Sequence, residues 1–374
     1  MKINFNIIDG KKCIFDLPLW LKKYNFNNPL ILIDKNLLNN SPYIKKFIIF
    51  FKKFTFLKIL YDYDFEPSYE YLDNLKKQIK NFKNYELIDV IICIGGGSTI
   101  DTGKGLSIIL KNPGKSIVYR GFPTYIKKNL PLIAIPSTTG TGSEVTYNAS
   151  FIDTKTKIKM GINYENNYPI LTLLDPLIVK DMPLNVLRSS GCDLLVHTLE
   201  SFMSKKSNEL TRELSIKAYT LISKSFLKIL SNKGSINDWK NLQWACVWSM
   251  IAMSNSSAGP ASAFSYLLGT HFRINHGIAG AFFLKKIIHY NYKNNYIFSR
   301  LKNKRSKKDN KKIVKEIIFL LNKCKIPDDI ENLGVKRKED LGLFFKHYDS
   351  VKNAFNFNPL KIKKKEFLEI IFRK

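Results

Sequence analysis

The first half of the chain alternates short apolar runs with amphipathic stretches, and this alternation restricts the possible folds more than any other feature of the sequence. Apolar runs predict buried strands within residues 28–36, 86–97 and 130–140. Between them, apolar residues at helical spacing predict helices at Tyr69–Phe82 and Asp101–Leu110. Strands that alternate with helices form a parallel sheet with helical crossovers. We therefore expect an α/β fold for this half.

From about Pro183 onward the apolar spacing becomes helical, as in residues Glu209–Leu230. The change falls at LLDPLIVKDMP, where two prolines mark a turn. A chain of 374 residues is long enough for two or three domains. The sequence therefore predicts an α/β domain over residues 1–182 and an all-α domain over residues 183–374.

A glycine-rich segment, IGGGSTIDTGKG at residues 94–105, follows a predicted strand and opens a predicted helix. Successive glycines let the backbone approach a pyrophosphate, and the start of a helix offers free N–H groups to phosphates. The segment is neither a GxGxxG fingerprint nor a Walker A loop. A plain tight turn is the alternative interpretation.

A second polar segment, PSTTGTGSEVT at residues 136–146, also follows a predicted strand. In open α/β sheets, loops at neighbouring strand ends meet the same ligand, so two such loops favour a dinucleotide. Asp34 ends the strand ILID, a position from which a carboxylate accepts hydrogen bonds from a ribose and repels a 2′-phosphate. This favours NAD over NADP, although an aspartate at a strand end is as often a simple turn residue.

A candidate metal site comes from the second half of the chain. Asp193 and His197 lie four residues apart in GCDLLVHTLESF, a predicted helix, and therefore project from one face. A carboxylate and an imidazole in this arrangement can bind one divalent cation, although a local side-chain contact is the commoner reason for such a pair. His276, in NHG at a later helix start, is the candidate third ligand.

Composition limits the remaining classes of function. The net charge of +29 is spread along the chain together with abundant Asn, Ile and Tyr, which favours composition bias over a nucleic-acid surface. Five widely spaced cysteines without a CxxC pair suggest neither disulfides nor a zinc knuckle. The chain has neither a signal-peptide core at its start nor an apolar run of about 18 residues, so a cytoplasmic protein without a membrane segment is expected.

Taken in order, these motifs resemble the iron-containing (group III) alcohol dehydrogenases over nearly the whole chain. The resemblance rests on GGGSTIDTGK, PSTTGTGSEVT, Lys159, LLDP, Asp193 with His197, the HG at His276 and the NP at Asn358. It implies a Rossmann-like NAD(P)-binding α/β domain and a helical domain that binds the metal and the substrate, a dehydroquinate synthase-like architecture. The segments ASAFSY and EPSYEYL resemble a branch that includes phosphonoacetaldehyde reductases and acidic-sugar oxidases.

The resemblance also implies roles for individual residues. The expected cofactor-binding residues are Gly95, Gly96, Gly97, Ser98 and Asp101 on one side, Thr138, Thr139 and Ser143 on the other, and Lys159 near the nicotinamide ribose. Asp193, His197 and His276 match three of the family's four usual metal ligands. Where the family has two further histidines, one a ligand and one close to the substrate, this chain has Ser262 and Tyr266.

Three hypotheses follow for the altered metal site. Asp193, His197 and His276 could hold Fe²⁺ or Zn²⁺ with water or the Ser262 hydroxyl completing the coordination. His271, which occupies neither expected histidine position, could instead replace the missing ligand. In the third hypothesis the metal is weakly bound or lost, and Tyr266 or His271 polarises the substrate carbonyl by hydrogen bonding.

The function expected from these features is NAD(H)-linked interconversion of an alcohol and an aldehyde or ketone, with the metal as Lewis acid and Tyr266 and His271 as proton-relay candidates. The basic composition favours a small anionic substrate, with Arg273 as a possible anion partner. A homodimer without a nucleic-acid or membrane partner is expected. The alternatives are a dehydroquinate synthase-like lyase that returns its NAD unchanged and a non-catalytic cofactor-binding protein.

Overall fold

The structure is a computed structural model that describes residues 6–54, 56–62, 66–304 and 306–372. The chain forms two compact units, Met1–Met182 and Pro183–Lys374. The first contains a parallel sheet with helices, and the regular elements described in the second are all helical. This confirms the predicted fold class, an α/β half followed by an all-α half.

The sheet of the first unit has six parallel strands in the order β1-β8-β5-β4-β2-β3. The strands are β1 (Asn6–Asp9), β2 (Pro29–Asp34), β3 (Leu57–Tyr61), β4 (Val90–Gly95), β5 (Leu132–Pro136) and β8 (Leu171–Leu174). The three strands predicted from apolar runs are β2, β4 and β5, which are neighbours in the middle of the sheet. Their sequences are continuously apolar because helices cover both faces of the sheet, so the side chains on both sides of each strand are buried.

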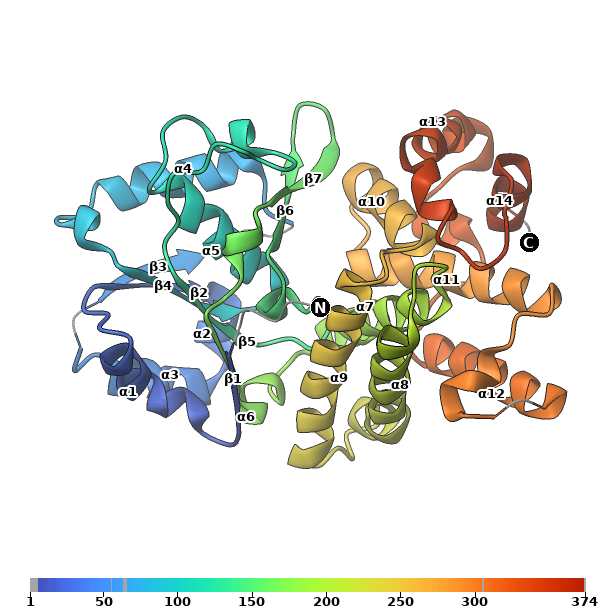
Figure 1. Cartoon of the computed structure of the whole chain (residues 1–374), viewed down its shortest axis with the longest axis horizontal. Helices are drawn as coiled ribbons and strands as arrows, with labels where there is room; N and C mark the ends of the chain where they lie inside the picture. The colour runs from blue at the N-terminus through green and yellow to red at the C-terminus, as the bar shows by residue number, and fades with distance from the viewer. Residues whose placement is uncertain (1–5, 55, 63–65, 305, 373–374) are drawn as a thin grey trace. The chain divides into compact units, whose positions relative to one another are not determined.

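Helices cover the two faces of this sheet and form two separate cores (Figure 1). On one face pack α4 (Tyr69–Lys80) and α5 (Gly97–Ile109), and on the other pack α1 (Leu17–Lys23) and α3 (Pro42–Phe51). Two short helices, α2 (Lys35–Asn40) and α6 (Pro176–Val179), follow β2 and β8. Helix α5 starts at Gly97, four residues before the predicted start, because the turn after β4 is tight enough to place the third glycine in the helix.

An antiparallel hairpin of β6 (Asn148–Asp153) and β7 (Ile158–Asn163) completes the first unit and was not predicted. The Tyr69 hydroxyl donates a hydrogen bond to the Met160 carbonyl at 2.6 Å, which ties the hairpin to the start of α4. Lys159 lies on β7, so its position depends on this hairpin.

The second unit is built around α7 (Leu184–Met203), in which every residue from Ser189 to Met203 is buried. The other helices are α8 (Glu209–Leu230), α9 (Ile236–Ser254), α10 (Pro260–Phe272), α11 (His276–Lys293), α12 (Lys307–Lys323), α13 (Arg337–Phe355) and α14 (Lys364–Ile371). A helix buried on all sides has no solvated face, so each polar side chain on α7 needs a partner inside the protein.

Among the described residues, no helix is both long enough and apolar enough to cross a membrane.

Candidate functional site

The glycine loop, residues 95–98, connects strand β4 to helix α5. Gly95 ends the strand, Gly96 is the N-cap residue of the helix, and Gly97 is the first helical residue. The N-cap residue, a glycine, has no side chain, and the described residues show no side-chain capping hydrogen bond at this helix start. The N–H groups of the first helical turn and the positive end of the helix dipole favour a bound anion such as a pyrophosphate.

The second loop, residues 136–146, packs directly against the glycine loop. A Cβ atom at Gly96 would lie 3.2 Å from Thr138 Cγ2, and one at Gly97 would lie 2.5 Å from Thr141 Oγ1. A side chain at Gly97 would therefore require Thr141 to move, and one at Gly96 would make a tight contact with Thr138, so the close packing of the loops favours glycine besides any approach to a phosphate. The structure thus brings together the two loops that the sequence predicts to meet one ligand.

A buried polar network joins helix α5 to the second loop. The Ser143 hydroxyl donates to the Asp101 carboxylate at 2.5 Å and accepts from Lys104 Nζ at 2.8 Å. Lys104 is fully buried and also donates to the Asn148 carbonyl at 2.8 Å. Asp101 and Ser143, both expected to bind the cofactor, are therefore bonded to each other and to a buried lysine.

Burial changes the protonation equilibria of this network. Removal from water lowers the pKa of Lys104 from 10.5 to about 8, although the negative charges of Asp101 and Glu144 act in the opposite direction. Burial likewise raises the pKa of Asp101, against the opposing effect of the Lys104 ammonium. Sequence reasoning missed Lys104, although its spacing of three residues after Asp101 on a predicted helix was a usable signal.

The other expected cofactor residues occupy varied environments. Asp34 is the N-cap residue of α2 and accepts a hydrogen bond from the Leu37 N–H at 2.8 Å. This is the role of a simple turn residue, the alternative that the sequence left open for Asp34. Burial raises the pKa of its carboxyl group. Lys159 forms an ion pair of 2.7 Å with Glu66. Thr139 Oγ1 is buried and has no hydrogen-bond partner among the described residues. A buried hydroxyl without a partner, in the loop that packs against the glycine loop, is compatible with a polar ligand at these loops.

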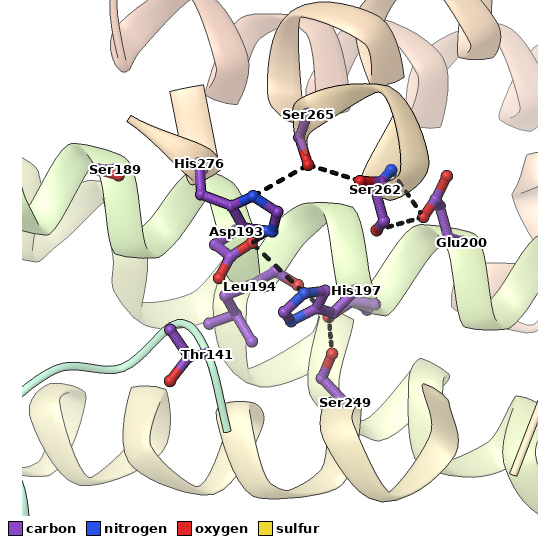
Figure 2. A network of polar contacts seen from close by, with 12 residues as sticks. Thr141, Ser189, Asp193, Leu194, His197, Glu200, Ser249, Ser262, Ser265 and His276 are labelled. Atoms are coloured by element: carbon purple, nitrogen blue, oxygen red, sulfur yellow. Dashed lines mark hydrogen bonds and ion pairs between the residues drawn. The ribbon is translucent and has the colours of Figure 1, made fainter. Parts of the chain in front are cut away.

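Asp193, His197 and His276 form the metal group, with one ligand atom from each side chain lying within 4.8 Å of the others. Nε2 of His197 is 3.4 Å from Asp193 Oδ1, and Nε2 of His276 is 3.9 Å from the same oxygen. Figure 2 shows the three side chains pointing toward one another, two from α7 and one from the start of α11. The spacing and the helix start that the sequence predicted are therefore both present.

A close crossing of helices brings His276 to the other two side chains. A Cβ atom at Gly277 would lie 2.0 Å from the Ser189 carbonyl oxygen, which is backbone of α7 one turn before Asp193. Asn275 caps α11, since its side chain accepts a hydrogen bond from the Gly277 N–H at 3.2 Å. The HG sequence is thus the point where α11 starts against α7.

Glu200, one turn beyond His197 on α7, binds the start of α10. Its carboxylate accepts hydrogen bonds from the N–H groups of Gly259, Ala261 and Ser262, and from the Ser262 hydroxyl at 2.6 Å. Burial raises the pKa of Glu200, whereas these four hydrogen bonds lower it. The Ser262 hydroxyl proton is therefore committed to Glu200. Sequence reasoning missed Glu200, although it lies three residues after His197 on a predicted helix.

The two predicted catalytic residues lie in different environments on α10. The Tyr266 ring stacks on the His276 ring, with centroids 5.2 Å apart and an interplanar angle of 18°. His271 is exposed in the last turn of the helix, where its Nδ1 is 2.9 Å from Thr270 Oγ1. The structure thus places Tyr266 beside the metal group.

The donor set of the metal group suits a divalent cation. Two imidazoles and one carboxylate are the ligands of mononuclear Fe²⁺ sites with open coordination positions, and they also suit Zn²⁺. His197 Nδ1 is buried and has no hydrogen-bond partner in the described part of the chain. A buried imidazole nitrogen without a partner is costly, and this cost disappears if that nitrogen is the one that binds a cation.

Comparison with known proteins agrees with this geometry. The model of the family "Iron-containing alcohol dehydrogenase" matches residues 5–176, and that of "Fe-containing alcohol dehydrogenase family, C-terminal" matches residues 188–374. The chain belongs to the iron-containing alcohol dehydrogenase family, whose members bind NAD and a divalent metal.

Individual relatives point to the same family. The chain is 31% identical to the 1,3-propanediol dehydrogenase of Citrobacter freundii over 218 residues, which cover 58% of this chain and 56% of that protein, about half its length. It is 28% identical to the sulfoacetaldehyde reductase of Bilophila wadsworthia, covering 84% and 83% of the two chains. A solved sulfoacetaldehyde reductase from Bifidobacterium kashiwanohense in complex with NAD⁺ has the same fold, with a TM-score of 0.86, 20% identity and coverage of 99% and 96%.

Proposed function

We propose that the chain is a metal-dependent, NAD(H)-linked oxidoreductase that interconverts an alcohol and an aldehyde or ketone. The observation that supports the proposal best is the group of Asp193, His197 and His276, which offers two imidazoles and a carboxylate within 4.8 Å. The first unit adds a glycine loop whose helix start is open to an anion. Residues 1–182 are then the NAD-binding domain, and residues 183–374 bind the metal and the substrate.

Asp193, His197 and His276 would hold Fe²⁺ or Zn²⁺ in this proposal. When bound, the cation supplies Lewis acidity toward the substrate oxygen, and the nicotinamide supplies or accepts the hydride. The two imidazoles and the carboxylate would hold the cation, and a set of three protein ligands would leave room for substrate.

The backbone of the glycine loop would bind the cofactor pyrophosphate. Asp34 would accept hydrogen bonds from the adenosine ribose, and its carboxylate disfavours the 2′-phosphate of NADP. The residues assigned to the cofactor are Asp34, Gly95, Gly96, Gly97, Ser98, Asp101, Thr138, Thr139, Ser143 and Lys159. Because Asp101 and Ser143 bond to each other, we propose that they also hold helix α5 against the second loop.

Tyr266 and His271 are the proposed proton-relay groups. Tyr266 stacks on His276 and is therefore beside the metal group, where its hydroxyl can hold a proton. His271 is exposed and can exchange protons with solvent. Each of the two is a separate candidate for passing a proton between the substrate oxygen and water, because residues five apart on a helix lie on different faces.

For the fourth coordination position we favour water over the Ser262 hydroxyl. Ser262 is 5% exposed and donates its proton to Glu200, so its role in the observed hydrogen bonds is to secure the start of α10. The same reasoning makes His271 a weaker candidate ligand, because it lies on an exposed part of α10.

The proposed substrate is a small carbonyl compound that carries an anionic group. The net charge of +29 favours anions, and a relative covering 84% of this chain is named for sulfoacetaldehyde, an aldehyde with a sulfonate group. Arg273, three residues before His276 at the end of α10, is the proposed anion partner. We further propose a cytoplasmic homodimer without a nucleic-acid or membrane partner.

The test is elemental analysis of protein purified without chelator or affinity metal, combined with NAD binding by calorimetry, for the wild type, His276→Ala and Ser262→Ala. We expect near-stoichiometric iron or zinc in the wild type and Ser262→Ala, loss of metal in His276→Ala, and NAD binding in all three. Anionic aldehydes should then support continuous NADH oxidation. A wild type that binds NAD but takes up no metal after anaerobic iron loading contradicts the proposal. Turnover of substrate without net NADH consumption would instead favour the lyase alternative.

A further inference from the structure

His276 has a neighbour that no family motif assigned. The Ser265 hydroxyl oxygen lies 3.0 Å from Nδ1 of His276, and Ser265 itself is completely buried. Figure 2 shows Ser265 above the imidazole ring, on the side away from Asp193. The two nitrogens of this ring therefore face different partners, with Nε2 3.9 Å from Asp193 Oδ1.

The direction of the hydrogen bond follows from the second contact of Ser265. Its hydroxyl donates to the Ser262 carbonyl oxygen at 2.6 Å, and a carbonyl can only accept. A hydroxyl has one proton, so the Ser265 oxygen is an acceptor toward His276. Nδ1 of His276 must then carry a hydrogen, so in the neutral form of the ring Nε2 carries none and directs its lone pair toward Asp193.

The Ser262 carbonyl, which accepts the last of these hydrogen bonds, is itself held in place. The Ser262 carbonyl belongs to the first turn of α10, whose N–H groups are bound by the buried Glu200 carboxylate. The Tyr266 ring, stacked on His276, limits rotation of the imidazole out of its plane. His197 differs, because its Nδ1 has no hydrogen-bond partner among the residues described.

We propose that Ser265 is a positioning residue that sets the tautomer of His276 and presents Nε2 as the metal ligand. The inference rests on the metal site of the proposed function, and it adds a residue that touches neither metal nor substrate. A hydrogen bond to the second nitrogen of a ligating histidine fixes the ring and makes the first nitrogen a better ligand. Ser265 lies in the same turn of α10 as Ser262, the residue that stands where the family usually has a histidine ligand.

The first experiment uses the unmodified, metal-free protein. Long-range ¹H–¹⁵N spectra at pH 8, where an ordinary histidine is neutral, distinguish the two tautomers of each of the five histidines. The spectrum of His276→Ala assigns the His276 signals. We expect hydrogen on Nδ1 of His276 and none on its Nε2. Hydrogen on Nε2 in the wild type would overturn the proposal without the need for any variant at Ser265.

The second experiment compares Ser265→Ala with Ser215→Ala, a matched control. Ser215 is also a completely buried serine of the helical unit, and its hydroxyl pairs with Ser201. In Ser265→Ala we expect a shift toward the Nε2–H tautomer and a Zn²⁺ affinity about 10 to 100-fold weaker, measured by chelator competition. Ser215→Ala should leave both readouts as in the wild type.

Each outcome decides the proposal. If Ser265→Ala binds Zn²⁺ more weakly but keeps the wild-type tautomer, or if Ser215→Ala weakens binding equally, Ser265 has only a structural role and the proposal is wrong. An unchanged Zn²⁺ affinity of Ser265→Ala would also refute the proposal. Both readouts are taken without NAD or substrate, so they are independent of whether the protein turns over an aldehyde.

Discussion

Lys104 gives a prediction at the scale of one residue, because burial lowers its pKa from 10.5 to about 8. Between these pH values the unfolded chain holds a proton on this lysine that the folded chain has released. Unfolding then takes up a proton, so Lys104 makes the free energy of unfolding rise with pH across this window. The expected gain is about 3 kcal/mol between pH 8 and 10.5.

The measurement is urea unfolding of the wild type and Lys104→Met at several pH values from 7 to 10.5. Buried cysteines and tyrosines with raised pKa, such as Cys13, oppose this trend at high pH, but they are common to both proteins and cancel in the difference. We expect the wild type to gain stability relative to Lys104→Met as the pH rises. A difference independent of pH would show that the Lys104 pKa is not lowered.

Individual residues also show which parts of the candidate metal site could be predicted from the sequence. Asp193, His197 and His276 were found because a helical spacing and a helix start are visible in one sequence. Glu200 and Ser265 were missed because their importance lies in partners from other turns or helices. Spacing shows which side chains share a helix face, but it does not show which buried acceptor receives a hydroxyl proton.

At the scale of elements, the crossing of α7 and α11 predicts the effect of Gly277→Ala. The new Cβ would meet the Ser189 carbonyl at 2.0 Å, and this contact is backbone, so the helices must separate. We expect destabilisation by about 1 to 3 kcal/mol and weaker Zn²⁺ binding, since His276 moves with the start of α11. Urea unfolding and chelator competition provide the two readouts.

Gly342→Ala is the matched control for that substitution. Gly342 lies within α13, and a Cβ there would have no neighbour within 4 Å. Alanine should stabilise this helix by about 0.5 to 1 kcal/mol through its higher helix propensity and leave Zn²⁺ binding unchanged. If Gly277→Ala behaved like Gly342→Ala, the close approach of α11 to α7 would not position His276.

Elements differed in how well their sequences predicted them. Residues Glu209–Leu230, chosen for their helical apolar spacing, coincide with the bounds of helix α8, and the structure shows Asn208 capping its start. The β6–β7 hairpin was missed although β7, IKMGIN, alternates apolar and polar residues over six positions, which was a usable strand signal; in β6, NASFID, the alternation breaks where Phe151 and Ile152 are adjacent. Its position depends on contacts with distant residues such as Tyr69, which a local pattern does not contain.

At the scale of the whole molecule, the order of elements was sufficient to predict the fold class. Continuous apolar strands separated by helices require a parallel sheet, and the later helical spacing requires a helical half. The structure has two compact units, Met1–Met182 and Pro183–Lys374. Which unit binds which ligand stays a prediction, and it can be tested on the intact protein with one method.

Hydrogen exchange of the intact chain, measured with NAD alone and with Zn²⁺ alone, tests this division of binding. NAD should slow exchange at the N–H groups of the first turn of α5 and in residues 136–146, because a pyrophosphate would accept from groups that no side chain caps. Zn²⁺ should slow exchange around Asp193, His197 and His276, which it would join across two helices. At 100 times its Kd, each ligand adds up to about 2.7 kcal/mol of stability to the structure it binds.

The contrast between the two ligands is what makes the exchange experiment decisive. Addition of Zn²⁺ to His276→Ala should leave its exchange pattern unchanged, while NAD should still slow exchange in the first unit. Slowing by NAD in α7 and α11 but not at the glycine loop would contradict the assignment of residues 1–182 to the cofactor. It would also remove the reason to read the uncapped start of α5 as a pyrophosphate site.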